Sequence, residues 1–204
     1  MTTATPGAQT ALLIVDLQND FLDARGAYAR GGDTNPAALA LPPRVAQVAR
    51  AVRAAGGVVV ASQFTLWPAA DGEPMVSPHL RSLRPYLRKG DFAPGSWGQA
   101  NVPALEGLVD VAVQKVAYSA FFNTQLDWYL RRVGVQRLAV CGIVTNGGVA
   151  SSVRDAHMRD YQVVVLHDGC AAFGEDRHRT ALADMGTLAE LASCADFADT
   201  VARP

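Results

Sequence analysis

The sequence predicts an α/β protein built on a parallel β-sheet. Short apolar runs rich in Val, Ile and Leu alternate with stretches whose apolar residues recur at helical spacing. The apolar runs are continuous rather than alternating, which is typical of strands covered by helices on both faces. No repeat, linker or low-complexity segment divides the 204 residues. We therefore expect a single domain over residues 1–204, with residues 1–10 flexible.

The first half of the chain predicts two strands and a helix. Residues 11–15 are five apolar residues followed by Asp16, so a strand should end at this acid. An aspartate at the carboxyl end of such a strand lies where open α/β sheets bind ligands. A helix should begin at Pro42-Pro43 and end before Gly56-Gly57, and residues 58–64 should form a second buried strand.

Residues 65–103 predict a long connection, because six prolines interrupt them and they show little periodicity. A connection of this length is usually functional, as a lid or an interface. Its aromatic residues are open to two interpretations: they line a pocket or a subunit contact, or they hold the loop to the domain. These residues are Trp67, Tyr86, Phe92 and Trp97.

The second half continues the alternation of strands and helices. Strands are expected at residues 108–115, from 138, at 161–166 and near 188–191, and helices at 149–159, at 177–185 and from about 193. A further helix should run through Leu130, with Asn123 as its cap and Gly134 after its end. Lys115, one of two lysines, closes the third strand, either beside a carboxylate or as an ordinary charge at a strand end.

The turn between residues 142 and 149 is the centre of the expected site. It joins a buried strand to a helix through Gly142 and Gly147-Gly148. A helix N-terminus after a tight turn leaves backbone N–H groups around one small space, which suits a developing negative charge. The alternative is an ordinary connection between a strand and a helix.

Composition argues against several classes of protein. The net charge of −1 gives no electrostatic case for binding nucleic acid or an anionic membrane, and no apolar run approaches the length of a membrane span. Three cysteines far apart argue against a disulfide framework and for a cytoplasmic protein. The four histidines lack metal-ligand spacing, so we expect no protein-bound metal.

Several segments, in this order along the chain, resemble the isochorismatase-like hydrolase family, a family of cysteine hydrolases. The matching segments are residues 13–21 (LIVDLQNDF), 95–98 (GSWG), 115–121 (KVAYSAF), 142–149 (GIVTNGGV), 154–156 and 168–171. The resemblance implies a three-layer α/β/α fold whose six-stranded, mostly parallel sheet has the order 3-2-1-4-5-6. It also implies a site at the carboxyl ends of strands one, three and four, a cis peptide bond at Val144–Thr145, no cofactor, and a homodimer or homotetramer.

Most members of that family use an aspartate, a lysine and a nucleophilic cysteine, which here correspond to Asp16, Lys115 and position 148. Position 148 is Gly148, and neither Cys141 nor Cys170 is placed to substitute for the missing thiol. Isochorismatases also carry glycine there, and they hydrolyse a vinyl ether without a covalent intermediate. The resemblance therefore favours catalysis by water.

Three hypotheses follow for the activity on a small-molecule substrate. The first is hydrolysis of isochorismate or a related enol ether with Asp16 as general acid, which requires burial to raise its pKa against the opposing effect of Lys115. The second is a C–N hydrolase in which Asp16 activates water. The third is a catalytically inactive homologue that binds a small molecule, although a buried charge pair is costly to retain.

Seven further residues are expected to bind substrate. Some have structural alternatives, since Asn146 and Gly147 fit a role in shaping the turn and Tyr118 fits a place in the core. The seven are Phe21, Gln63, Trp97, Tyr118, Thr145, Asn146 and Gly147.

Overall fold

The computed structural model describes residues 6–203. The expected flexibility of residues 1–10 falls in part on residues 1–5, which lie outside the described residues. Pro6–Gln9 form a 3-10 helix, and Thr10 is the first residue of the first strand. Among residues 6–203, no helix has both the length and the apolar character that crossing a bilayer requires.

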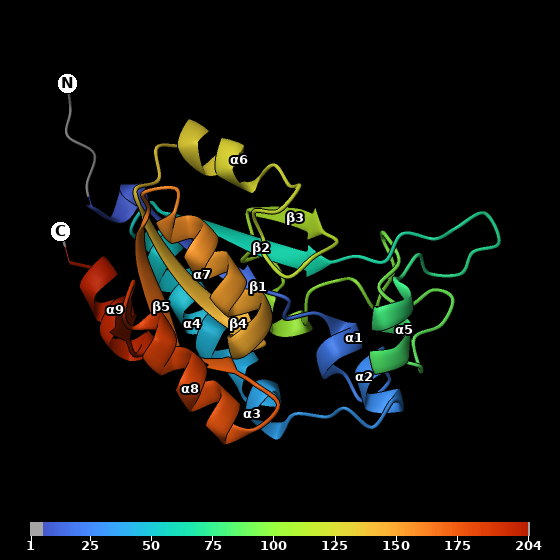
Figure 1. The fold of residues 1–204 in the computed structure, drawn as a ribbon. Helices are drawn as coiled ribbons and strands as arrows, with labels where there is room; N and C mark the ends of the chain where they lie inside the picture. Colours follow the sequence, from blue (N-terminus) through green and yellow to red (C-terminus); the bar gives the residue numbers. More distant parts are fainter. Residues whose placement is uncertain (1–5, 204) are drawn as a thin grey trace.

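The described chain forms a six-stranded sheet in which every strand pairing is parallel (Figure 1). Its order is β3-β2-β1-β4-β5-β6, which confirms the predicted topology. The strands are β1 (Thr10–Val15), β2 (Val58–Phe64), β3 (Val111–Lys115), β4 (Arg137–Ile143), β5 (Gln162–Ala171) and β6 (Glu190–Ala192).

Helices cover both faces of the sheet, as right-handed crossovers require. The helix α4 (Leu41–Ala54) connects β1 to β2 and packs against α9 (Cys194–Val201) on one face. The connections that lead to β4, β5 and β6 cross the sheet in the direction opposite to that from β1 to β2. Because each crossover is right-handed, their helices lie on the other face of the sheet. In Figure 1, α7 lies in front of the strands and α4 behind them. The helices of this second face are α6 (Leu126–Arg132), α7 (Ala150–His157) and α8 (Glu175–Met185).

The core is centred on β1, whose residues Ala11, Leu12, Leu13, Ile14 and Val15 have no exposed surface. A central parallel strand has helices on both sides, so each of its side chains is buried. Each fully buried Leu, Ile or Val stabilises the fold by about 1.5–3 kcal/mol relative to exposure. This rigid centre fixes the position of the residue that follows it.

The sheet places the site at its switch point. Successive strands run outward from β1 through β2 to β3, and then outward from β4 through β5 to β6. The crevice between the carboxyl ends of β1 and β4 is where open α/β sheets bind ligands. Asp16 follows β1, and the turn at residues 145–149 follows β4.

The structure corrects several predicted boundaries. The N-cap residue of α6 is Gln125, and Thr124 Oγ1 accepts a hydrogen bond from the Leu126 N–H, so Asn123 is not the cap. Asn123 has φ = 52°, which a cap in extended conformation does not have. The strand β5 continues through Ala171, whereas apolar character alone predicts an end near residue 166.

The segment 65–103 forms the end of the molecule on the right of Figure 1, together with α1 (Asn19–Leu22) and α2 (Ala27–Arg30). It contains one short helix of its own, α5 (Pro78–Leu83). Phe92 is fully buried against Ala27 and Tyr28, so this aromatic residue holds the segment to the domain.

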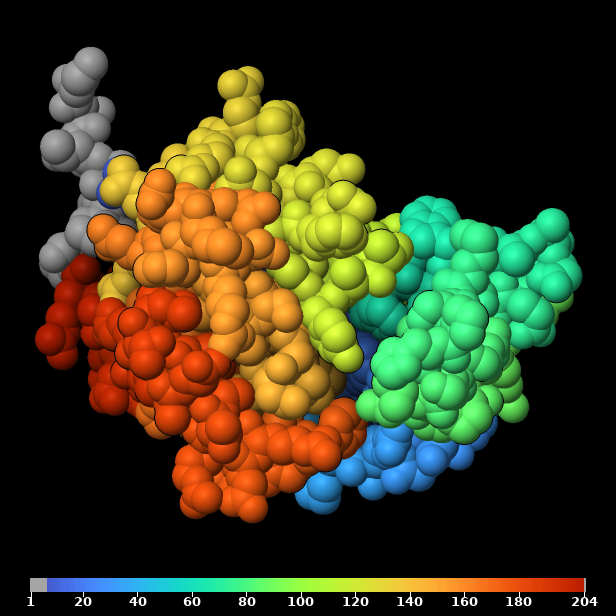
Figure 2. Space-filling view, in the orientation of Figure 1, coloured from blue at the N-terminus to red at the C-terminus, as the bar shows by residue number. Residues whose placement is uncertain are grey.

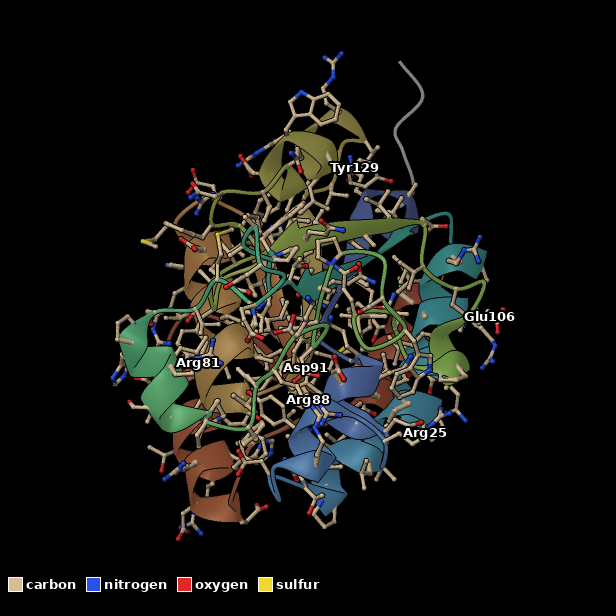
Figure 3. The ribbon with its side chains drawn as sticks, turned by 90° about the vertical axis from the view of Figure 1, so that its right-hand side faces the viewer. Arg25, Arg81, Arg88, Asp91, Glu106 and Tyr129 are labelled. Carbon is tan, nitrogen blue, oxygen red and sulfur yellow. The ribbon has the colours of Figure 1, made fainter. Side chains whose placement is uncertain are left out.

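Polar contacts reinforce this packing. Arg30 makes an ion pair of 2.6 Å with Asp91, which lies beside Arg88 near the middle of Figure 3. The Asp20 carboxylate accepts hydrogen bonds from the N–H groups of Ala27 and Phe92. The segment is therefore fastened to the helices that follow β1, beside the crevice.

Candidate active site

Asp16 and Lys115 meet across the end of β2. Asp16 is held in a left-handed backbone conformation (φ = 56°), and its N–H donates to the carbonyl of Ser62. The Lys115 Nζ atom lies 2.7 Å from Asp16 Oδ2, and the two side chains are only 2% and 8% exposed. The prediction that these two side chains lie close together is therefore confirmed.

Further hydrogen bonds hold the pair in place. The Ser62 hydroxyl donates to Asp16 Oδ1 at 3.0 Å, and Lys115 Nζ donates to the carbonyl of Ala117 at 2.9 Å. A buried ion pair is maintained only when such additional bonds satisfy its remaining polar atoms. Ser62 was not predicted, although a serine among the apolar residues of β2 is the signal that would have indicated it.

Burial controls the protonation of Asp16. Desolvation raises the pKa of this carboxyl above its ordinary value of 3.8, and the charge of Lys115 and the Ser62 hydroxyl offset only part of that effect. The sequence leaves the balance between burial and Lys115 open. In the structure, desolvation is the larger effect, so the Asp16 carboxylate is more basic than an exposed aspartate.

Gly148 lies next to this pair, in the π-helical turn Thr145–Val149. A Cβ atom added to Gly148 would lie 3.4 Å from Asp16 Oδ2, 3.0 Å from Val15 Cγ1 and 3.1 Å from the carbonyl oxygen of Ile143. The backbone of Gly148 is outside the left-handed region, so its conformation does not require glycine. Without a side chain, glycine leaves the carboxylate uncovered on this side, where even a Cβ would be in tight contact with Val15 and Ile143.

The peptide bond before the turn corrects one prediction. The cis bond joins Ile143 and Val144, one residue earlier than expected. Val144 is extended and serves as the N-cap residue, and Thr145 already belongs to the turn.

A cavity of about 340 Å³ opens over Asp16 and Lys115. Of the expected residues, it is lined by Asp16, Phe21, Lys115, Tyr118, Asn146 and Gly148. Its other lining residues include Tyr28, Phe64, His79, Arg84, Phe173 and Arg177. In Figure 2 a cleft separates the green surface of the segment around residues 75–90 from the yellow-green and orange surfaces, with dark blue atoms of the N-terminal region visible at its base.

Four expected residues do not line this cavity. Gln63 turns to Asn101, with 3.4 Å between its Nε2 and Oδ1 of the asparagine. Trp97 is 44% exposed and lies under the Arg25 guanidinium. Thr145 is fully buried with its hydroxyl 2.8 Å from His178 Nδ1, and Gly147 packs beside Tyr118 and Val144. Thr145 and Gly147 shape the turn rather than the cavity wall.

The three cysteines are buried away from this cavity. Burial raises the pKa of the Cys170 thiol to about 12 and that of Cys141 well above its usual range. A thiol with so high a pKa is almost wholly protonated at neutral pH and is a poor nucleophile. The site therefore holds a carboxylate and an ammonium without a thiolate.

Comparison with known proteins agrees with this geometry. A family model for the isochorismatase domain matches residues 10–198. The chain is 36% identical over 192 residues to the ureidoacrylate amidohydrolase RutB of Methylobacterium radiotolerans, covering 89% of this chain and 74% of that protein. It is 32% identical over 208 residues to the protein of the same name from Serratia proteamaculans, covering 96% and 84%.

Solved structures share the whole fold. A cysteine hydrolase from Pseudomonas syringae pv. phaseolicola superposes with a TM-score of 0.81 at 25% identity, covering 98% of both chains. An isochorismatase family protein from Desulfovibrio vulgaris superposes with a TM-score of 0.80 at 27% identity, covering 96% and 99%. By its fold and by its relatives, the chain belongs to the isochorismatase family and is a hydrolase.

Proposed function

We propose that this protein hydrolyses a C–N bond of a small amide or ureide, with water as the direct nucleophile and Asp16 as its base. The observation that carries the proposal is that Asp16 and Gly148 line the same cavity, with no side chain at the position where the family resemblance implies a nucleophilic cysteine. The curated relatives, which are ureidoacrylate amidohydrolases, favour C–N hydrolysis over hydrolysis of isochorismate.

The proposed chemistry requires a base, a positive charge that holds the base, and donors for the oxyanion. Asp16 takes a proton from water as the water oxygen bonds to the carbonyl carbon. The positive charge of Lys115, 2.7 Å from Oδ2, keeps the carboxylate oriented and limits the rise of its pKa. In this proposal, free backbone N–H groups at the start of the turn at residues 145–149 stabilise the oxyanion, as the N–H groups at a helix N-terminus can. The Gly147 N–H is not among them, because it donates to the Val144 carbonyl. The C–N bond then breaks, and Asp16 returns its proton to the departing nitrogen.

A second candidate is hydrolysis of an enol ether, which requires a protonated acid. The raised pKa of Asp16 favours this candidate, because it increases the fraction of protonated carboxyl at a given pH. In that reaction Asp16 protonates the enol carbon, and water adds to the resulting oxocarbenium ion. The cavity of about 340 Å³ over Asp16 has room for water in both reactions.

Two product assays separate the candidates. Purified protein is incubated with ureidoacrylate and a panel of primary amides, and ammonia is measured. In parallel it is incubated with isochorismate, and pyruvate is measured. We expect ammonia release that falls at least about 100-fold in Asp16→Asn, since a positioned general base contributes roughly 10²–10⁴-fold. Asp23→Asn is the matched control, because Asp23 is a surface residue paired with Arg25.

Pyruvate without ammonia would favour the second candidate. Neither product, from protein with an intact fold, would contradict both and favour a homologue that only binds a small molecule. Ammonia release that persists in Asp16→Asn would assign the activity to another group.

A further inference from the structure

The charges on the cavity wall are unbalanced. Among the described residues that line the cavity, Asp16 is the single acid, whereas Lys115, Arg84 and Arg177 are cations. Lys115 is committed to Asp16 at 2.7 Å. The two guanidinium groups, those of Arg84 and Arg177, therefore have no acidic partner among the residues that line the cavity.

Arg177 is the less neutralised of the two. It lies in the first turn of α8 and takes part in no ion pair among residues 6–203. The nearby acid Asp176 is paired with Arg179 at 2.9 Å, and Asp184 is paired with Arg154. A guanidinium is always charged and presents donors in a planar fork that matches a carboxylate.

Arg84 reaches the cavity from the other side of the cleft, just after α5. Its guanidinium lies 5.6 Å from the centre of the Tyr28 ring, with Nε 3.4 Å from the tyrosine hydroxyl. Asp33 lies 3.5 Å away and neutralises part of its charge. The guanidinium of Arg84 is thus held in position, while that of Arg177 has no acidic partner in the described part of the chain.

Aromatic rings form the apolar part of the wall. Tyr28 and Phe173 are stacked with ring centroids 6.0 Å apart and an angle of 14° between planes, and Phe21 lies 4.6 Å from Tyr28. Such walls favour flat, unsaturated groups. A cavity of about 340 Å³ is near the lower end of the size range of small-molecule sites.

We propose that Arg177, with support from Arg84, binds the carboxylate of an anionic substrate in this cavity. Arg177 is then the specificity-determining residue that separates anionic from neutral substrates. The position of the scissile C–N bond beside Asp16 rests on the proposed function, but the anion site does not. Neither arginine was among the residues expected from the sequence.

Binding of a compound that the enzyme cannot hydrolyse tests the anion site alone. The probe is cinnamate, a flat unsaturated carboxylate without a C–N bond, compared with its neutral methyl ester by calorimetry at low salt. We expect wild-type protein to bind cinnamate about tenfold more tightly than the ester, because hydrogen bonds from a guanidinium to a charged carboxylate are stronger than those to a neutral ester. Arg177→Gln should reduce this preference to about twofold or less, and Arg177→Lys should retain part of it.

Arg179→Gln is the matched control, because Arg179 lies on the same helix, is exposed and does not line the cavity. It should keep the full preference for cinnamate. Equal binding of the two compounds by wild-type protein, no binding of cinnamate at millimolar concentration, or an unchanged preference in Arg177→Gln would overturn the proposal. A clear preference in a protein that releases no ammonia would leave the anion site standing while the proposed function fails.

Discussion

Gly148 lies beside the carboxylate of Asp16, so that a side chain at position 148 would begin in contact with it. The Cβ atom of such a side chain lies 3.4 Å from Asp16 Oδ2, next to the buried contact of that residue with Lys115. The protein thus has a buried acid and a buried lysine in contact, with a glycine beside them that, in our proposal, occupies the place of a nucleophilic thiol.

Gly148→Cys should create a reactive thiol. Asp16 would lie within reach of the new sulfhydryl and would accept its proton, while Lys115 stabilises the resulting charge. The added Cβ would approach Val15 Cγ1 and the Ile143 carbonyl oxygen to 3.0 and 3.1 Å, so we expect a stability loss of about 1–3 kcal/mol. Alkylation by iodoacetamide, followed by mass spectrometry, measures the reactivity.

Wild-type protein is the control for this alkylation. Its three cysteines are buried, so the folded protein should take up little reagent. A folded Gly148→Cys variant that reacts no faster than wild type would show that position 148 does not face the cavity.

Asp16→Asn should abolish activity without destabilising the protein at neutral pH. Burial raises the pKa of Asp16, which means that the folded state disfavours the ionised carboxyl despite Lys115. A neutral amide of the same shape avoids this cost, so the variant should be at least as stable as wild type in urea unfolding at pH 7. A loss of about 3–5 kcal/mol, as expected when a favourable buried ion pair is broken, would contradict this assignment.

The same shift predicts how stability changes with pH. Because the folded pKa of Asp16 is raised, its contribution to stability is fully present below the unfolded value near 3.8 and is lost as pH rises through the folded pKa. The unfolding free energy of wild type minus that of Asp16→Asn should therefore become more negative as pH rises across that interval. A difference that increases with pH would indicate a lowered pKa instead.

Ser62→Ala should raise the pKa of Asp16 further. The serine hydroxyl donates to Oδ1 at 3.0 Å and so favours the ionised carboxyl. We expect the titration of Asp16, followed by carbon-13 NMR of the labelled carboxyl, to move to higher pH. Ser119→Ala is the matched control, since Ser119 is also buried and accepts a hydrogen bond from the Phe121 N–H without contacting Asp16. Equal titration in both variants would contradict a role for Ser62.

The local sequence was sufficient to predict the strand β1 and the position of the residue that follows it. The run at residues 11–15 is continuously apolar because a central parallel strand is buried on both faces, and this fixes the place of Asp16. Lys115 was found because a lysine is unusual at the end of a buried strand. The strand order and the role of position 148 came from the family resemblance, not from apolar periodicity.

The rest of the site depends on contacts between distant segments. Arg84 and Phe173 reach the cavity from loops whose paths are not encoded in any periodic pattern. Trp97 was expected there as an aromatic residue of the matching segment 95–98, but it lies outside the cavity. The sign of the pKa shift of Asp16 depends on how completely the fold excludes water, which no spacing of residues reveals. The prediction of Asn123 as the cap was wrong because its backbone is left-handed and the helix begins after Gln125.

The pH dependence of kcat/KM on a C–N substrate tests the role of Asp16 most directly. If Asp16 acts as an ionised base, the rate rises with pH through its raised pKa and reaches a plateau above it, so the acid limb lies above pH 3.8. In Ser62→Ala this limb should move to higher pH. A rate that instead falls as pH rises through the titration of Asp16 would show that the protonated carboxyl is the active form, and would contradict the assignment of Asp16 as the base.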